Sequence, residues 1–497
     1  MAPTPPHPAL SLTARDRAVV WHPCSHLRDA GEFPPVEIVS ALGSRLTFAD
    51  GRTCLDAISS WWCKSLGHGH PRLLAALAAQ AARFEHVITA DTTHRALVRV
   101  SERLVAIANG AEPEVWGHWP DPGRLPTPGP FATVFYAENG STAIEIALKM
   151  ALQWQAQSGH PQRSAFAALS GGYHGETVGA LSVGDCGLYK DAYAPLLFPC
   201  TMITAVPWRS GPGDPLWMDA AGEWPRIEAQ LAAVAGKLAA IIYEPVLQGA
   251  GGMRPVSPDL QRRLRAWADA HGVLLIADEI AAGMGRCGTM LAGMHAERSK
   301  FSIGSRIPAI RKPSSATSGP TPCRPDFAVM GKGLTGGVLP LAAVVTTAAV
   351  RAAFDAAPLA GRSFLHSTTY SGHALALAVA DAALDVYADE GVLARAVKWG
   401  LHLRTGLADL ARTRPYMKNV RGVGMVAAVD LRTGDGGVLD PAARTGRCVY
   451  REAIARGAWL RPLGDTMYLC PPLNTAPADI AAMLAILADA CDAVLAR

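Results

Sequence analysis

Short apolar runs rich in valine and isoleucine alternate along this chain with stretches of helical periodicity, and this alternation restricts the possible folds. The runs at 132–136, 238–243 and 273–277 each have the length of a buried strand. Helical patterns separate them, for example the one that Pro258 opens and Gly272 closes. Strands joined by helices form a mostly parallel, doubly wound sheet, so we expect an α/β fold. Ligands bind such sheets at the carboxyl ends of the strands, so the residues after each run are the first candidates for a site.

The composition narrows the possible partners. The 497 residues are 49% apolar and 18% charged, with a net charge of +4 and no basic block, so we expect several domains and no nucleic acid partner. No apolar stretch reaches the roughly 18 residues of a membrane span, and the first residues do not resemble a secretory signal. The ten cysteines are scattered without a C-x-x-C pair, which predicts reduced thiols and a cytoplasmic protein.

Two stretches interrupt the alternation of strands and helices. Residues 120–130 are dense in proline and glycine, and residues 298–325 are rich in serine, proline and arginine without either period. We expect both to be surface loops, the second mobile and without a catalytic part. From about Leu393 helical patterns return, followed by short strand patterns near 458–460 and 467–469, which suggest a smaller C-terminal domain.

A lysine between glycines is the most reactive candidate. Gly331-Lys332-Gly333 follows an apolar run, and glycines let the backbone approach a ligand closely. A partly buried lysine falls below its free pKa of about 10.4 and becomes a nucleophilic amine. Taken alone, the segment fits a solvated loop lysine better. It also matches a dinucleotide fingerprint with Gly336, but a β-branched run with Pro340 follows instead of a helix, which disfavours a nicotinamide enzyme.

A possible phosphate site follows the run at 132–136. Gly140 and Ser141 stand where a helix begins, and the N–H groups of a helix start bind phosphate. The alternative is an ordinary capping box, with Thr142 as the cap and Glu145 three residues later.

Two further loops carry groups that suit a planar cofactor. Asp278 ends a buried strand, where a carboxylate could keep a ring nitrogen protonated, although a turn aspartate is the plain alternative. Tyr173, after the run 165–169, could stack on a ring or simply belong to a turn. His68 and His70 lack a third ligand at metal spacing, so we expect no metal site.

Together these segments resemble the class III, fold-type I aminotransferases over nearly the whole chain. The similarity rests on one signature, from Asp278-Glu279 through Gly283-x-Gly285-Arg286 to Lys332-Gly333. The resemblance implies pyridoxal 5′-phosphate as cofactor and a homodimer. It also implies a large domain at 86–389, interrupted by the loop at about 298–325, and a small domain formed by 1–85 and 390–497.

Finer features are similar to the branch of this family that acts in biotin synthesis. They are Trp21-His-Pro23, Ser59-Ser-Trp61-Trp62, Gly172-Tyr-His-Gly-Glu-Thr177, Gln248-Gly-Ala-Gly-Gly-Met253 and Trp459-Leu-Arg461-Pro462. They imply transfer of an amino group from S-adenosylmethionine to 8-amino-7-oxononanoate, giving 7,8-diaminononanoate. The alternative within enzymes is another ω-aminotransferase that uses lysine, a diamine or an ω-amino acid, and a binding-only homologue or a dehydrogenase stays open from other classes.

The resemblance assigns five residues to the cofactor. Lys332 would form the Schiff base and move the proton, and Asp278 would pair with the pyridinium nitrogen. Gly140 and Ser141 would bind the phosphate, and Tyr173 would stack on the ring and face the substrate.

Five further positions are assigned to the partner subunit and the substrate. Thr368 and Thr369 match a loop that reaches the phosphate of the neighbouring subunit. Arg461 would hold the carboxylate of the acceptor, with Trp61 and Ser367 lining the substrate pocket.

Two departures from the family pattern concern these assignments. Cys24 replaces a tyrosine that faces the substrate in many relatives, which leaves the identity of the donor open. Ser367-Thr368 replaces a Gly-Pro pair of some members, so the roles in that loop are less firmly implied.

Overall fold

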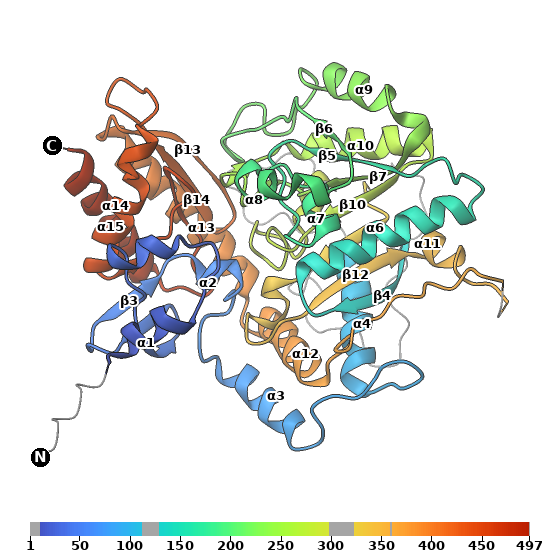
Figure 1. Ribbon diagram of the computed structural model, residues 1–497, viewed down its shortest axis with the longest axis horizontal. Helices are drawn as coiled ribbons and strands as arrows, with labels where there is room; N and C mark the ends of the chain where they lie inside the picture. The colour runs from blue at the N-terminus through green and yellow to red at the C-terminus, as the bar shows by residue number, and fades with distance from the viewer. Residues whose placement is uncertain (1–9, 112–128, 298–322, 358–359, 497) are drawn as a thin grey trace, which may run out of the picture.

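The computed structural model describes residues 10–111, 129–297, 323–357 and 360–496. Its centre is a seven-stranded sheet with the order β4-β12-β11-β10-β7-β5-β6 (Figure 1). The strands are β4 (Phe131–Ala137), β5 (Ala165–Leu169), β6 (Cys200–Ile203), β7 (Leu238–Tyr243), β10 (Leu274–Asp278), β11 (Phe327–Met330) and β12 (Ala342–Thr347). β12 runs antiparallel to both of its neighbours, and the other pairs in this sheet are parallel. The predicted mostly parallel α/β sheet is therefore confirmed.

Helices cover both faces of this sheet, so the strands β7, β10, β11 and β12 bury both sets of their alternating side chains. In β7, Ile242 packs into the cluster that holds α6, whereas Ile241 packs into the cluster that holds α9 and α10. The longer helices are α3 (Pro71–Ala81), α4 (Arg95–Ala108), α6 (Gly140–Gln157), α9 (Trp224–Ala232), α10 (Pro258–His271), α12 (Ala374–Asp389), α13 (Val392–Arg412), α14 (Thr445–Ala455) and α15 (Pro477–Leu495). Shorter ones are α1 (Leu12–Val19), α2 (Ser59–Trp62), α7 (Val178–Ser182), α8 (Gly187–Lys190) and α11 (Ala348–Ala352).

Local signals explain where the predicted helices begin and end. α10 starts at Pro258 and ends before Gly272, whose φ of 63° gives the left-handed cap that glycine adopts without strain. α6 begins at Gly140, three residues earlier than a cap at Thr142 would allow. The cap is Asn139, whose side chain accepts the Thr142 N–H at 3.0 Å, so the alternative of a Thr142 capping box is wrong.

Two smaller sheets bring the ends of the chain together. One has the order β1-β2-β3-β15 and joins β1 (Ile38–Leu42), β2 (Arg45–Phe48) and β3 (Thr53–Asp56) to β15 (Ala458–Trp459). The other contains β13 (Met417–Val423), β14 (Val426–Leu431) and β16 (Thr466–Leu469). A two-stranded ribbon pairs β8 (Leu247–Gln248) with β9 (Arg254–Pro255). Figure 1 accordingly shows the blue N-terminal and the red C-terminal segments side by side, next to the large sheet.

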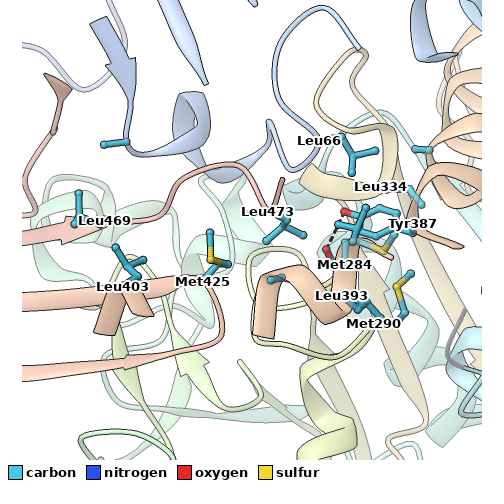
Figure 2. Close-up of a cluster of buried hydrophobic side chains, with 14 of the residues drawn as sticks. Leu66, Met284, Met290, Leu334, Tyr387, Leu393, Leu403, Met425, Leu469 and Leu473 are labelled. Carbon is cyan, nitrogen blue, oxygen red and sulfur yellow. Dashed lines mark hydrogen bonds between the residues drawn. The ribbon is translucent and has the colours of Figure 1, made fainter. Parts of the chain in front are cut away.

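An apolar cluster connects these parts across the molecule (Figure 2). It combines Leu334, which follows β11, with Tyr387 of α12, Leu403 of α13 and Leu469 of β16, all buried. The Tyr387 hydroxyl donates to the carbonyl of Met284 at 2.9 Å, so the polar atom of this buried ring is satisfied.

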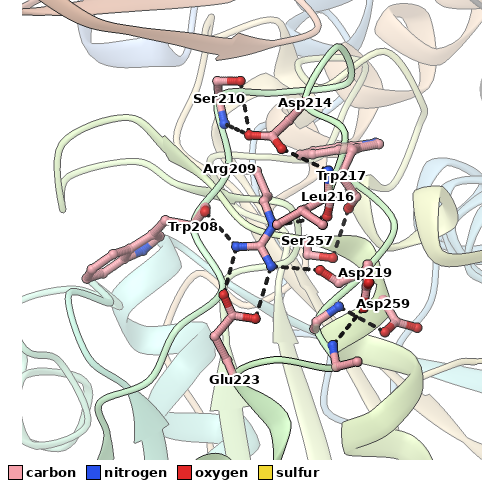
Figure 3. A network of polar contacts seen from close by, with 12 residues as sticks. Trp208, Arg209, Ser210, Asp214, Leu216, Trp217, Asp219, Glu223, Ser257 and Asp259 are labelled. Carbon is pink, nitrogen blue, oxygen red and sulfur yellow. Dashed lines mark hydrogen bonds and ion pairs between the residues drawn. The ribbon is translucent and has the colours of Figure 1, made fainter.

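The loop before α9 is held by a polar network instead (Figure 3). Arg209 forms a bidentate pair with Glu223, with both distances 3.0 Å, and its other hydrogen bonds go to the carbonyls of Trp208, Leu216 and Asp219. Such a fork fixes the loop through geometry as well as charge.

Both predicted loops lie mainly outside the described residues, since 112–128 and 298–322 are not described. Within the described part of the chain, no helix is both long enough and apolar enough to span a membrane.

Candidate active site

The carboxyl edge of the large sheet gathers polar side chains from neighbouring strands. Asp278 lies beside Val329 of β11, and Ala277 lies beside Tyr243 of β7. Because these strands are parallel, Glu244, Asp278 and Lys332 all emerge at the same edge. The expectation that the residues after the strands form a site agrees with this register.

A cavity of about 550 Å³ opens at this edge, which is within the size range of small-molecule sites. Five of the predicted site residues line it: Gly140, Ser141, Tyr173, Asp278 and Lys332. Further lining residues are Trp62, Cys63, Glu138, Asn139, His174, Gly175, Glu176, Glu244, Ile280, Ala281 and 337–341.

Lys332 is held in a strained position inside the cavity. Its φ of 43° lies in the left-handed region, which costs a residue with a Cβ about 1–2 kcal/mol. Its amine lies 5.3 Å from the ring centre of Trp62 and donates to no hydrogen-bond acceptor among the described residues. Burial lowers the pKa of Lys332, while the charges of Asp278 and Glu244 oppose that shift. The amine is therefore both available and easier to deprotonate than a surface lysine.

Asp278 is oriented by two neighbours. Its Oδ2 lies 2.8 Å from Nδ1 of His174, and its Oδ1 accepts the Ile280 N–H at 3.0 Å. Both side chains are buried, and Nε2 of His174 has no hydrogen-bond partner among the described residues. The carboxylate therefore has a fixed direction toward the cavity rather than the role of a surface turn residue.

Sequence reasoning missed two buried partners of this site, His174 and Glu244. Glu244 accepts the N–H groups of Tyr173 and Gly249, and burial raises the pKa of this carboxyl to about 7. Its position directly after a strand is the same signal that pointed to Asp278. His174 follows Tyr173 in the sequence motif and carried no separate signal.

The start of α6 offers free backbone donors. The N–H groups of Gly140 and Ser141 have no acceptor among the described residues, whereas the Ser141 hydroxyl accepts the Thr177 N–H at 3.0 Å. An added Cβ at Gly140 would lie 2.7 Å from a methyl of Ile280, so any larger residue would have to displace that side chain. An anion at this helix start would be bound chiefly by backbone donors.

Tyr173 stands at the wall of the cavity with its hydroxyl bound to Glu176 at 2.9 Å. Burial and the neighbouring charge of Glu176 raise the pKa of Tyr173, so the phenol stays neutral. A neutral aromatic ring in this place suits stacking on a planar cofactor.

Arg461 and Trp61 lie together but do not line the cavity. The guanidinium carbon sits 5.0 Å from the ring centre of Trp61, and Nη2 donates to the carbonyl of Cys24 at 2.7 Å. Burial raises the pKa of the Cys24 thiol, with Glu176 raising it further and Arg461 opposing. Glu176 lines the cavity, so Arg461, Trp61 and Cys24 lie near the cavity entrance. Trp62, not Trp61, forms part of the cavity wall.

The loop that carries Ser367, Thr368 and Thr369 does not reach the cavity of its own chain. It is attached nearby, since the N–H of Tyr370 donates to Glu138 at 3.0 Å. The Thr368 hydroxyl is buried without a hydrogen-bond partner in the part of the chain that the structure describes. None of these three residues therefore lines the cavity that the same chain forms.

The cavity fits pyridoxal phosphate in three respects that the side chains themselves provide. It has a buried amine without a hydrogen bond, a carboxylate fixed by His174, and unused N–H groups at the start of α6. Lys332, Asp278 and Gly140 with Ser141 would hold the aldehyde end, the ring nitrogen and the phosphate, respectively.

The two histidines His68 and His70 do not belong to a group of metal-ligating side chains among the described residues. No cluster of three or more histidine, cysteine or acidic side chains that could hold an ion is found there. His68 instead contacts the Asp56 carboxylate at 2.8 Å, and His70 faces Glu390 at 3.4 Å.

Comparison with known proteins gives one consistent family. The profile described as Aminotransferase class-III matches residues 28–300 and 317–491, leaving only 301–316 unmatched between them. The adenosylmethionine-8-amino-7-oxononanoate aminotransferase of Synechococcus elongatus is 36% identical over 480 residues, covering 96% of this chain and 99% of its own. The enzyme of the same name from Mycobacterium leprae is 33% identical, covering 95% and 94%.

Solved structures agree with the sequence relatives. The adenosylmethionine-8-amino-7-oxononanoate aminotransferase of Methanocaldococcus jannaschii superposes with a TM-score of 0.81 at 26% identity, covering 97% of this chain and 99% of its own. An amine transaminase from an uncultivated Pseudomonas species, solved with PLP bound, gives 0.80 at 29% identity, covering 96% and 99%. The chain belongs to the class III aminotransferases, the family of pyridoxal-phosphate-dependent transaminases.

Proposed function

We propose that this aminotransferase converts 8-amino-7-oxononanoate to 7,8-diaminononanoate in biotin synthesis, with S-adenosylmethionine as the amino donor. Support comes from relatives of that name that align over 99% and 94% of their length. The observation that carries the proposal in the structure is Arg461. Its guanidinium forms no ion pair with any described residue and lies against the Trp61 ring near the cavity. A half-buried, unpaired guanidinium is a ready site for the carboxylate of the acceptor.

Pyridoxal phosphate, when bound, supplies an electron-accepting ring that carries the amino group between the two substrates. Lys332 Nζ then acts as the base that takes a proton from the substrate carbon bearing the amino group. Its lowered pKa leaves more of the amine neutral near physiological pH than a free lysine would have. Asp278, fixed by His174, provides the negative charge opposite the ring nitrogen. Trp62, itself buried beside the amine, keeps water from this side.

Arg461→Ala tests the assignment of the acceptor site. A charge-assisted pair contributes about 1.5–3 kcal/mol, so the acceptor KM should rise about 10- to 100-fold, far more than that of the donor. Arg456→Ala is the matched control, because Arg456 pairs with Glu452 on the surface of α14. Steady-state kinetics with each substrate varied in turn gives both constants. Equal KM values in Arg461→Ala and the unchanged enzyme would rule out this carboxylate site.

The identity of the donor is decided by a half-reaction. The loaded enzyme is mixed with S-adenosylmethionine or with lysine, and the absorbance of the cofactor is followed without acceptor. We expect S-adenosylmethionine to convert the cofactor. The amine transaminase among the structural relatives, and Cys24 in place of a tyrosine, favour another ω-amine donor as the second candidate. Conversion by lysine alone would select that candidate and leave the acceptor assignment intact.

The remaining assignments belong to the same proposal. We propose a homodimer in which Thr368 and Thr369 complete the phosphate site of the partner, since neither reaches the cavity of its own chain. A cytoplasmic location suits the ten cysteines, all of them unpaired thiols. We also propose that 1–85 and 390–497 form a small domain and 86–389 a large one, which the pairing of β3 with β15 supports.

A further inference from the structure

The turn that carries the two tryptophans has an unusual backbone. Ser59, Ser60, Trp61 and Trp62 have φ values of 51°, 44°, 70° and 73°. Four consecutive residues with side chains thus occupy the left-handed region, which only glycine adopts without strain. A left-handed turn of this kind persists only where its surroundings hold it.

Asp56 supplies most of the contacts that hold the middle of this turn. Its Oδ1 accepts the Ser60 N–H at 2.9 Å, and its Oδ2 accepts the Ser60 hydroxyl at 2.7 Å. The same Oδ2 lies 2.8 Å from Nε2 of His68, and the Asp56 side chain is fully buried. One carboxylate therefore binds both the backbone and the side chain of Ser60, with His68 as its support.

The first residue of the turn is anchored separately. The Ser59 hydroxyl donates to the carbonyl of Cys470 at 2.6 Å and receives a bond from Arg286 at 3.3 Å. These contacts fix where the turn begins. They do not reach Ser60, whose backbone N–H is bound by Asp56 instead.

The turn places its two rings against two different functional groups. Trp62 donates to the Tyr468 hydroxyl at 3.1 Å and lies 5.3 Å from the Lys332 amine. Trp61 lies 5.0 Å from the Arg461 guanidinium. β3 pairs in parallel with β15, with Asp56 beside Trp459, so the chain segments after both strands leave in the same direction. Arg461 and the turn therefore meet at the end of this sheet.

We propose that Asp56 is a positioning residue of the active site: it holds the left-handed turn that sets Trp62 beside Lys332 and Trp61 beneath Arg461. Asp56 touches neither group itself and acts through the two rings. The part that concerns Arg461 rests on the proposed carboxylate site, whereas the part that concerns the turn does not.

Asp56→Asn is the variant that tests this role, because an amide removes the negative charge and keeps only one of the two oxygens that bind Ser60 and His68. Asp50→Asn is the matched control, since Asp50 lies in the exposed β2–β3 turn and contacts Arg52 instead. Ser60→Ala, which keeps the carboxylate and removes one donor, serves if the first variant does not fold. Asp56→Asn combined with Ser60→Gly tests whether Asp56 acts by holding the left-handed backbone at position 60, because glycine adopts this backbone without an anchor.

The readout that needs no substrate is fluorine NMR of the cofactor-loaded enzyme labelled with 5-fluorotryptophan. Trp61→Phe and Trp62→Phe assign two of the twelve tryptophan signals. Asp56→Asn, or Ser60→Ala in its place, should shift or broaden these two signals and leave the others unchanged. The acceptor KM should rise by about tenfold or more, since misplacing a binding group by about 1 Å has effects of this size. The combined variant with glycine should recover both in part, and Asp50→Asn should change neither.

Three results would overturn the proposal. Unchanged signals of Trp61 and Trp62 in Asp56→Asn would show that the turn does not depend on this carboxylate. No recovery with Ser60→Gly would mean that the charge of Asp56, rather than the backbone, is what matters. Equal changes in all tryptophan signals, also in Ser60→Ala, would mean a general loss of structure. If the two signals move while the acceptor KM does not, the positioning of the turn stands and the carboxylate role of Arg461 fails.

Discussion

Lys332 shows at the scale of one residue what a sequence can and cannot reveal. The flanking glycines were a visible sign, and the structure gives a reason for Gly333, whose added Cβ would lie 3.0 Å from that of Met284. The positive φ of Lys332 itself had no sign, because it depends on contacts with distant segments. For the same reason Asp278 was predicted, whereas its partner His174, in contact across 104 positions, was not.

Asp278→Asn should keep the cofactor and lose turnover. Breaking the buried pair between the carboxylate and the protonated ring nitrogen of the cofactor costs about 3–5 kcal/mol. The value of kcat should therefore fall at least about a hundredfold. The amide would also place its NH2 group where one of the two oxygens now faces Nδ1 of His174 or the Ile280 N–H. Absorbance of the bound cofactor and kcat are measured together. Asp269→Asn, an exposed site on α10, is the control. A kcat within a few-fold of the control would reduce Asp278 to a turn residue.

At the scale of elements, regular segments were predicted well and irregular ones were not. β7 and α10 have the predicted bounds because periodicity, Pro258 and Gly272 are local signals. The left-handed turn Ser59–Trp62 has no periodicity and no glycine, so nothing in the sequence indicated it. The cap of α6 was misplaced since Asn139 and Thr142 are both good caps, and only the backbone direction after β4 selects Asn139.

Glu279, the residue after β10, should make the free energy of unfolding depend on pH. Burial raises its pKa to about 8, although the N–H groups of Gly293 and Ala292 oppose this. The folded state then holds a proton that the unfolded state releases above its usual pKa of 4.5. Unfolding therefore releases protons between these values, and the free energy of unfolding falls as pH rises, by up to about 1.4 kcal/mol per pH unit.

Glu279→Gln isolates this contribution. Urea unfolding between about pH 5 and 8 should show a smaller loss of stability with pH in the variant than in the unchanged protein. A pH-independent change in the free energy of unfolding caused by the substitution does not affect this comparison. Glu223→Gln is the control, because its pair with Arg209 lowers the pKa of Glu223 and it does not titrate in this range. Identical slopes for the Glu279 variant and the unchanged protein would mean that this carboxyl is charged in the fold.

The segment between η4 (Ala292–Glu297) and β11 should be dispensable for catalysis. Residues 301–316 fall outside the family match, and Glu297 and Arg324 join the flanking ends by an ion pair with distances of 2.9 and 3.1 Å. Replacing 301–316 by a short Gly/Ser linker should leave kcat nearly unchanged. Stability should change little, by about 0.6 kcal/mol per halving of the loop. A folded, cofactor-loaded but inactive variant would give this segment a part in the site.

At the scale of the whole molecule, the sequence indicated the large sheet but not how the ends of the chain combine. β3 and β15 are too short to reveal their pairing, which joins Leu55 to Ala458. The small domain was expected from the resemblance alone. The structure adds that α3 packs against α12, so the N-terminal segment touches the large part of the molecule as well.

Complementation tests whether two chains build each site. Lys332→Ala chains are mixed with chains that carry Thr368→Ala and Thr369→Ala, under conditions that exchange subunits. Random pairing makes half of the dimers mixed, and each mixed dimer has one complete site, so about a quarter of the full activity should return. Each variant alone is the control and should be nearly inactive. No recovery despite proven exchange would place each site within one chain.

The pairing of β3 with β15 also sets the order in which the protein can be completed during its synthesis. Leu55 is synthesised long before its partner Ala458. At about 5–20 residues per second the interval is roughly 20–80 s. Throughout this time β3 has an open edge, and the tryptophan turn lacks Cys470 and Tyr468. The nascent chain therefore exposes one unpaired edge of β3, the edge opposite β2, until the segment around Ala458 has been made.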